Sequence, residues 1–133
     1  MKKTALIILA AMAAGFAHAQ TIVDTLPSGV RVAHIAKGTG IKPTATSRVA
    51  VHYRGTRVSD GVEFDSSYSR GAPAVFGLNQ VIPCWTEGLQ QIAVGGKAVL
   101  LCPSSTAYGA RGAGEGVPPN ADLRFEVELF DVR

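Results

Sequence analysis

The pattern of hydrophobic and polar positions divides the chain into a strongly apolar start and a body of short alternating segments. The alternation is clearest near the C-terminus, where apolar and charged residues take turns from Leu123 to Leu129. A period of two places successive side chains on opposite faces of a strand. This segment therefore predicts a strand with one buried face and one wet face.

Further strands are predicted upstream of this segment. In residues 48–54, Val49, Val51 and Tyr53 alternate with Ala50, His52 and Arg54, and residues 62–64 follow a turn at Asp60-Gly61. Asp-Gly supplies the positive φ values of a tight hairpin turn, so the two segments predict a hairpin. Apolar runs at residues 30–35 and 97–102 predict two more strands.

One short helix is predicted in the middle of the chain. Trp85, Leu89 and Ile92 recur at the i, i+4, i+7 spacing of one helical face. Pro83 suits the first turn, where its missing N–H costs nothing, and Gly95-Gly96 is expected to end the helix. With only two or three turns, the helix is expected to owe its stability to packing on a sheet.

The order of these elements predicts the fold class. Residues 103–108 have no clear period, and residues 109–119 form a glycine-rich loop before the last strand. Short strands with a single helix favour the α+β class. We expect a strongly twisted antiparallel sheet wrapped around one short α-helix.

The apolar start has the composition of a secretory signal peptide. Lys2 and Lys3 precede the apolar run of residues 5–14, and Ala17-His18-Ala19 follows. This run is shorter than the roughly 20 residues that a membrane-spanning helix needs. We therefore expect cleavage after residue 19, with Gln20 as the first mature residue and no cysteine there for a lipid anchor.

Cleavage changes the charge of the chain. Loss of Lys2 and Lys3 from 13 basic residues leaves 11, against 10 acidic residues, a formal net charge of +1. The basic residues are scattered, which argues against a nucleic-acid partner. Residues 20–133 are long enough for one modest core and predict a single domain without a membrane anchor.

The two cysteines, Cys84 and Cys102, predict a disulfide. An even number of cysteines in an exported protein favours a disulfide bond. Their separation excludes a C-x-x-C redox motif, and a zinc site would need His34 or His52, neither of which has a recurring ligand spacing to the cysteines. The disulfide is the favoured interpretation, and no metal site is predicted.

Common catalytic motifs are absent from the sequence. Gly95-Gly96-Lys97 resembles the end of a phosphate-binding loop, but Gln91 and Ala98 occupy positions that the motif reserves for Gly and Ser or Thr. There is also no G-x-S-x-G nucleophile elbow. No cofactor is therefore predicted.

Aromatic residues stand at the ends of the predicted strands and in the loops. Such residues most often belong to a core, but here they fall within six motifs that resemble, in family order, those of FKBP-type peptidyl-prolyl cis/trans isomerases. The motifs are Val51-His52-Tyr53-Arg54-Gly55, Gly61-Val62-Glu63-Phe64-Asp65-Ser66-Ser67, Val81-Ile82-Pro83-Cys84-Trp85-Thr86-Glu87-Gly88, Ala107-Tyr108-Gly109, Val117-Pro118-Pro119-Asn120-Ala121 and Leu123-Arg124-Phe125-Glu126-Val127-Glu128-Leu129. The resemblance covers residues 28–133.

The resemblance implies an FKBP-like sheet of five or six strands around a short helix, with an apolar cleft between them. It implies that Trp85 forms the floor of the cleft. The Ile82 N–H and the Tyr108 hydroxyl would donate hydrogen bonds to the substrate, and Arg70 would pair with Asp65. The catalytic residues that it implies are Tyr53, Phe64, Asp65, Tyr108 and Phe125. The substrate-binding residues that it implies are Phe76, Val81, Ile82, Trp85, Arg70 and Val117.

Four positions depart from the family pattern. Ala74 replaces a larger residue and Gly116 an aliphatic one, which is expected to open the cleft. Cys84 stands where the family usually has Gly, and Cys102 replaces an aliphatic strand residue. The resemblance thus places both cysteines beside Trp85, where a disulfide would fix the first turn of the helix.

The implied function is isomerisation of X-Pro bonds in exported proteins, which assists their folding. The implied partners are unfolded or partly folded proline-containing polypeptides, and macrolides of the FK506 and rapamycin class as inhibitors. A non-catalytic chaperone that holds chains in the same cleft is the alternative, and a small adhesin-like sandwich is less favoured. We expect a monomer, since no long helical segment precedes Ser28, in a Gram-negative periplasm or fully secreted.

Overall fold

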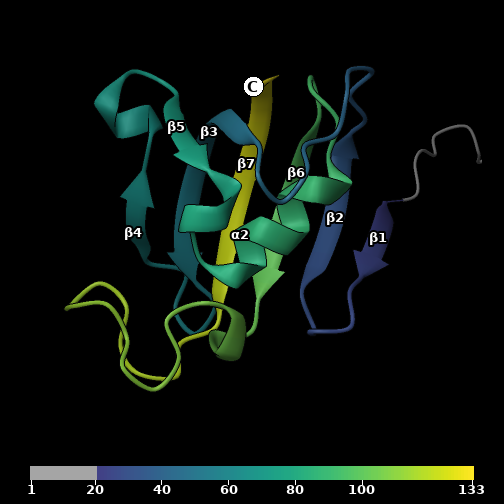
Figure 1. The fold of residues 1–133 in the computed structure, drawn as a ribbon. Coiled ribbons are helices and arrows are strands. Elements are labelled where there is room, and N and C mark those ends of the chain that lie inside the picture. Colours follow the sequence, from purple (N-terminus) through teal and green to yellow (C-terminus); the bar gives the residue numbers. More distant parts are fainter. Residues whose placement is uncertain (1–20) are drawn as a thin grey trace, which may run out of the picture.

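Seven strands form one antiparallel sheet in the computed structural model, which describes residues 21–133 (Figure 1). Their order across the sheet is β1-β2-β6-β7-β3-β4, and β5 also pairs with β3. The strands are β1 Ile22–Thr25, β2 Arg31–Ala36, β3 Arg48–Arg57, β4 Glu63–Ser66, β5 Ala74–Gly77, β6 Lys97–Cys102 and β7 Leu123–Val132.

The predicted fold and its main strands are confirmed. The β3–β4 hairpin turns at Asp60-Gly61, where Gly61 has a φ of +73° and the Val62 N–H donates to the Asp60 carboxylate at 3.1 Å. The sheet has more strands than the five or six expected, and no pattern predicted β1 or β5. Both have only four residues, too few for an alternation to stand out.

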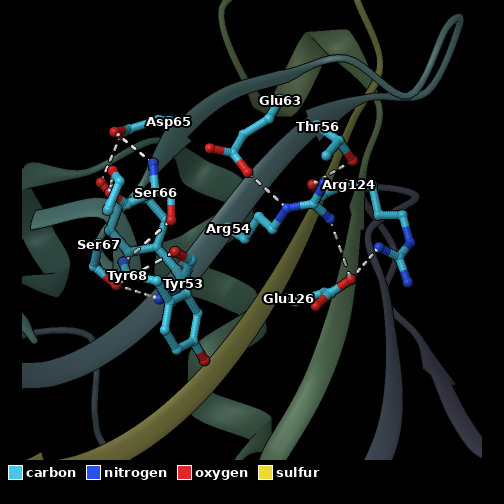
Figure 2. Close-up of polar contacts among 11 residues, drawn as sticks. Tyr53, Arg54, Thr56, Glu63, Asp65, Ser66, Ser67, Tyr68, Arg124 and Glu126 are labelled. Atoms are coloured by element: carbon cyan, nitrogen blue, oxygen red, sulfur yellow. Dashed lines mark hydrogen bonds and ion pairs between the residues drawn. The ribbon is translucent and has the colours of Figure 1, made fainter. Parts of the chain in front are cut away.

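The two longest strands, β3 and β7, lie side by side in the middle of the sheet. Along β7, the side chains of Leu123, Phe125, Val127 and Leu129 are at most 3% exposed, as their alternation predicted. The other face is wet. There the Arg54 guanidinium on β3 contacts Glu63 at 2.7 Å and Glu126 at 3.8 Å, which joins β4, β3 and β7 (Figure 2).

A short helix, α2 (Pro83–Gly88), covers the apolar face of the sheet (Figure 1). It begins with Pro83, as predicted, and a 3-10 turn at Leu89–Gln91 follows it. Gly88 allows the helix to approach β6 closely, since an added Cβ would lie 2.9 Å from Leu100 Cδ2. Trp85 on the helix and Leu89 and Ile92 after it are all buried, as their spacing predicted.

The predicted end of the helix at Gly95-Gly96 is wrong. The chain is already extended at Ile92, with φ −114° and ψ 128°. The Gly95 N–H donates to the Leu129 carbonyl on β7 at 2.8 Å, so the backbone here is bound to the sheet instead of to the preceding helical turn. Gly95 does take a positive φ of +92°, but in the turn that leads into β6.

A disulfide joins Cys84, in the first turn of α2, to Cys102, at the end of β6. The two Cα atoms are 5.6 Å apart, and the cysteines are 0% and 2% exposed. The predicted pairing is confirmed, and the bond lies inside the single core between helix and sheet.

The predicted signal peptide at residues 1–19 lies outside the described residues. Within residues 21–133, no helix is long and apolar enough to cross a membrane. The same residues contain no cluster of three or more His, Cys, Asp or Glu side chains that could hold a metal ion.

Candidate active site

A cleft of about 440 Å³ opens between α2, the inner face of β3 and β7, and the segment around Tyr108. It brings together side chains from β3, β4, β5, β7 and the start of α2. All five residues predicted as catalytic line it, with most of those predicted to bind substrate. The lining residues are Tyr53, Phe64, Asp65, Phe76, Gln80, Val81, Ile82, Trp85, Tyr108 and Phe125.

The indole of Trp85 forms the floor of the cleft and is 4% exposed. Three rings stand at nearly right angles to it, with centroid distances of 5.0 Å to Tyr53, 5.3 Å to Phe125 and 5.4 Å to Phe76. Edge-to-face packing of this kind holds aromatic rings in defined orientations. The floor and walls are therefore one rigid aromatic cluster whose upper surface is apolar.

Gly55 makes room for two of the walls. It pairs with Phe125 across β3 and β7, and Phe64 from β4 packs on Phe125 at 5.6 Å between centroids. A Cβ added at Gly55 would lie 2.7 Å from Phe64 Cζ and 2.8 Å from Phe125 Cε1. The absence of a side chain at this strand position thus lets both rings lie over the strand.

Three polar side chains at the rim bind one another. The Tyr53 hydroxyl donates to Asp65 Oδ2 at 2.6 Å, while Arg70 donates to Asp65 Oδ1 at 3.0 Å and to the Tyr53 oxygen at 2.9 Å. Partial burial acts to raise the pKa of Asp65, but the hydrogen bonds from Tyr53 and Arg70 outweigh it and lower that pKa. The carboxylate is therefore ionised at neutral pH, with its charge already paired.

The two serines after Asp65 fix this triad to the sheet. The Ser66 N–H donates to Asp65 Oδ1 at 2.9 Å, and the Ser66 hydroxyl accepts from the Tyr68 N–H at 3.1 Å. The fully buried Ser67 hydroxyl accepts from the Tyr53 N–H at 2.7 Å. Figure 2 shows these side chains gathered beside β3. The short polar residues thus hold Tyr53 and Asp65 in register.

Besides the buried Trp85 Nε1–H, two hydrogen-bond donors of cleft-lining residues have no partner among residues 21–133. One is the backbone N–H of Ile82, which precedes α2 and whose own carbonyl accepts from the Trp85 N–H at 2.9 Å. The other is the hydroxyl of Tyr108, whose pKa is raised by burial and by the nearby Asp65 charge, so it keeps its proton.

The structure places the remaining predicted residues elsewhere. Arg70 stands at the rim and reaches the cleft only through Tyr53 and Asp65. Val117 does not line the cleft, since its side chain is 3% exposed and packs in the core. Ala74 does not line it either. Gly116 lies against Phe64, and an added Cβ would be 3.2 Å from Phe64 Cβ.

Gln80 is a lining residue that the sequence did not predict. It directly precedes Val81-Ile82 and ends a short 3-10 turn, Leu78–Gln80. The one hint in the sequence was its position directly before the Val81-Ile82 motif. A single polar residue in a loop has no hydrophobic periodicity from which the direction of its side chain could be predicted.

The family model described as FKBP-type peptidyl-prolyl cis-trans isomerase matches residues 39–130. A protein named FKBP-type peptidyl-prolyl cis-trans isomerase FkpA from Aeromonas hydrophila is 52% identical over 83% of this chain and 40% of its own length. The Saccharomyces cerevisiae peptidyl-prolyl cis-trans isomerase FPR2 is 48% identical over 70% of each chain.

Solved structures are similar as well. The crystal structure of FkpA from Escherichia coli has a TM-score of 0.79 and 47% identity, over 84% of this chain and 51% of that one. AtFKBP13 has a TM-score of 0.76 and 31% identity, over 84% of this chain and 99% of that one. The chain spans about half or less of the first curated relatives that it matches.

Proposed function

The chain belongs to the family of FKBP-type peptidyl-prolyl cis-trans isomerases, and on that premise we propose that its cleft isomerises peptide bonds that precede proline. The observation that carries the proposal is an apolar aromatic cleft whose lining residues include two donors, Ile82 N–H and Tyr108 hydroxyl, that have no partner among residues 21–133. Such a site suits a short apolar segment of peptide held by its backbone.

The chemistry needs no nucleophile. Rotation about an X-Pro bond has to break amide resonance, and the barrier for peptide bonds is about 18–20 kcal/mol. Resonance places negative charge on the carbonyl oxygen, so the planar amide is more polar than the twisted one. An apolar, water-poor cleft penalises the planar form more and thereby favours the transition state.

Each part of the cleft has a role in this scheme. The flat proline ring packs on Trp85, while Tyr108 and the Ile82 N–H orient the chain on either side of it. Tyr53 and Arg70 bind the Asp65 carboxylate, so its charge does not draw water into the cleft. Phe64, Phe76 and Phe125 exclude solvent from the twisting bond.

The setting we propose is outside the cytoplasm. Residues 1–19 have the composition of a cleavable signal peptide, and the Cys84–Cys102 bond suits an oxidising compartment such as a Gram-negative periplasm. The substrates would be exported, proline-containing polypeptides that are still folding. The same apolar cleft is suited to macrolides of the FK506 and rapamycin class, and the domain of residues 20–133 would act as a monomer.

A prolyl-peptide isomerisation assay on residues 20–133 tests the activity. Phe125→Ala is expected to lower kcat/KM by about tenfold or more, because it removes a wall that contacts the twisting bond. Tyr108→Phe should lower it less, since only one donor is lost. Phe130→Ala is the matched control, because Phe130 is 46% exposed and lies outside the cleft.

Equal activity in all of these proteins would contradict the assignment of the cleft. A chaperone without isomerase activity would suppress aggregation of an unfolded chain but leave the peptide isomerisation rate at its uncatalysed value. Addition of FK506 tests whether the cleft is the site of catalysis, since its binding there should abolish the isomerase activity.

A further inference from the structure

The segment that follows Tyr108 forms a loop, residues 108–120, beside the cleft (lower edge of Figure 1). Its backbone is tied mainly to itself. The Gly112 N–H donates to the Tyr108 carbonyl at 3.0 Å. The Ala113 N–H donates to the Val117 carbonyl, and the Asn120 N–H to the Gly109 carbonyl, both at 2.8 Å. The loop therefore keeps its own shape, and its position over the domain depends on other contacts.

Arg57, at the end of β3, supplies one of these contacts. Two nitrogens of its guanidinium donate hydrogen bonds to the Asp60 carboxylate, Nε to Oδ1 at 3.0 Å and Nη2 to Oδ2 at 2.7 Å. The remaining nitrogen, Nη1, donates to the Gly116 carbonyl at 3.3 Å. Among residues 21–133, this is the one hydrogen bond that reaches residues 110–119 from outside the loop.

Asp60 orients the guanidinium for this contact. The hydrogen bond from Arg57 lowers the pKa of Asp60, so the carboxylate stays ionised at neutral pH. A fork-shaped pair of this kind fixes the plane of the guanidinium and leaves the third nitrogen aimed in one direction. The Arg57 side chain is only 19% exposed, in keeping with a fixed position.

The point that Arg57 binds is also where the loop meets the cleft. Gly116 lies against Phe64, with 3.2 Å between the position of an added Cβ and Phe64 Cβ. Phe64 in turn packs on Phe125, and both rings line the cleft. A contact that holds Gly116 in place therefore holds the loop against a wall of the site.

We propose that Arg57 is a positioning residue that clamps the loop of residues 108–120 onto Phe64 and so shapes the substrate-binding side of the cleft. The expected effect of Arg57 on kinetics rests on the proposed isomerase function, but the expected effect on the mobility of the loop does not. The pair is near the surface, where an ion pair adds little to global stability. The effect of losing it should therefore be local.

Hydrogen exchange of the peptide backbone tests the clamp without any substrate. In Arg57→Met, residues 109–120 should exchange about tenfold faster, as expected when a charge-assisted hydrogen bond that restrains local opening is lost. Arg54→Met is the matched control, because Arg54 also lies on β3 and pairs with carboxylates, but on the wet face. Unchanged exchange in Arg57→Met would overturn the proposal, as would equal acceleration in both variants.

Kinetics on prolyl peptides test the consequence for the cleft. Arg57→Met should raise KM about threefold to tenfold with kcat within about twofold, because the loop shapes binding while the Trp85 floor is untouched. Asp60→Asn should give a smaller change in the same direction. A loss of kcat at constant KM would contradict a role in positioning. If the wild-type protein has no isomerase activity, the proposed function fails, and the exchange experiment still decides whether Arg57 clamps the loop.

Discussion

At the scale of single residues, the site combines ionised groups with an apolar cleft by pairing those groups among themselves. The Tyr53 hydroxyl donates a hydrogen bond to Asp65, and Arg70 contacts both, so the Asp65 and Arg70 charges are paired. Burial raises the pKa of Tyr53, and the bond to Asp65 raises it further, so the phenol remains a donor at neutral pH. The triad thus serves to orient the cleft wall without drawing water into it.

Gly55 gives a residue-scale prediction. In Gly55→Ala, the new methyl group would fall within 3 Å of Phe64 and Phe125, so both rings have to leave their present positions in the cleft wall. We expect kcat/KM for a prolyl peptide to fall by about tenfold, as when reacting groups lose alignment by an ångström. Because the added methyl group overpacks a buried position, the free energy of unfolding should fall by about 1–3 kcal/mol.

The matched control for this change is Gly61→Ala in the β3–β4 turn. An added Cβ there meets no atom within 4 Å, although the positive φ makes the change mildly destabilising. It should leave kcat/KM unchanged. If Gly55→Ala keeps full activity, Gly55 does not position the two rings as the structure indicates.

At the scale of elements, α2 is too short to be stable by itself. Its six residues are held by tertiary contacts at both ends, the disulfide at Cys84 and the close approach of Gly88 to Leu100. Trp85 follows Cys84 directly, so the bond that anchors the helix also anchors the cleft floor. The short helix therefore fixes the position of the Trp85 indole in the cleft.

The disulfide gives an element-scale prediction. The double variant Cys84→Ala/Cys102→Ala should lose about 3 kcal/mol of unfolding free energy, the chain-entropy value for a closed loop of this size. Denaturant titration measures it. Alanine is chosen because both cysteines are buried and a serine hydroxyl would lack a partner.

Reduction of the wild-type protein provides the second measurement. Because both sulfurs are buried, a thiol reductant should act only after denaturant opens the domain. Rapid reduction of the folded protein, or a double variant as stable as wild type, would show that this bond does not anchor α2.

At the scale of the whole molecule, the sheet has one dry face and one wet face. The helix covers the dry face, while ion pairs such as Arg54–Glu63 and Arg124–Glu126 lie on the other (Figure 2). The core is therefore a single layer between helix and sheet, and aromatic rings that belong to this layer also line the cleft.

Neighbouring residues on β7 test this arrangement. Leu129 is fully buried and Phe130 is 46% exposed, although they are adjacent in the chain. Leu129→Ala should cost about 2–5 kcal/mol of unfolding free energy because it leaves a cavity. Phe130→Ala should cost less than about 1 kcal/mol, measured by thermal or denaturant unfolding. Similar losses in both variants would contradict a one-sided core.

Much of this fold could be predicted from the sequence because its signals are local. Alternation indicated β3 and β7, Asp60-Gly61 indicated the hairpin of β3 with β4, and Pro83 indicated the start of α2. The end of that helix was mispredicted because Gly95 bonds to Leu129, a residue far away in the chain. β1 was missed because four residues carry too little pattern.

The site was predicted through motifs, and the structure decided what each residue touches. The sequence by itself determined the alternating faces, the turn residues and the set of aromatic side chains, since these follow from backbone geometry and local order. Only the tertiary structure placed Val117 in the core, Gln80 in the cleft and Arg57 against Gly116. These contacts join residues from separate strands and loops, and such distances are set by how the whole sheet folds over the helix.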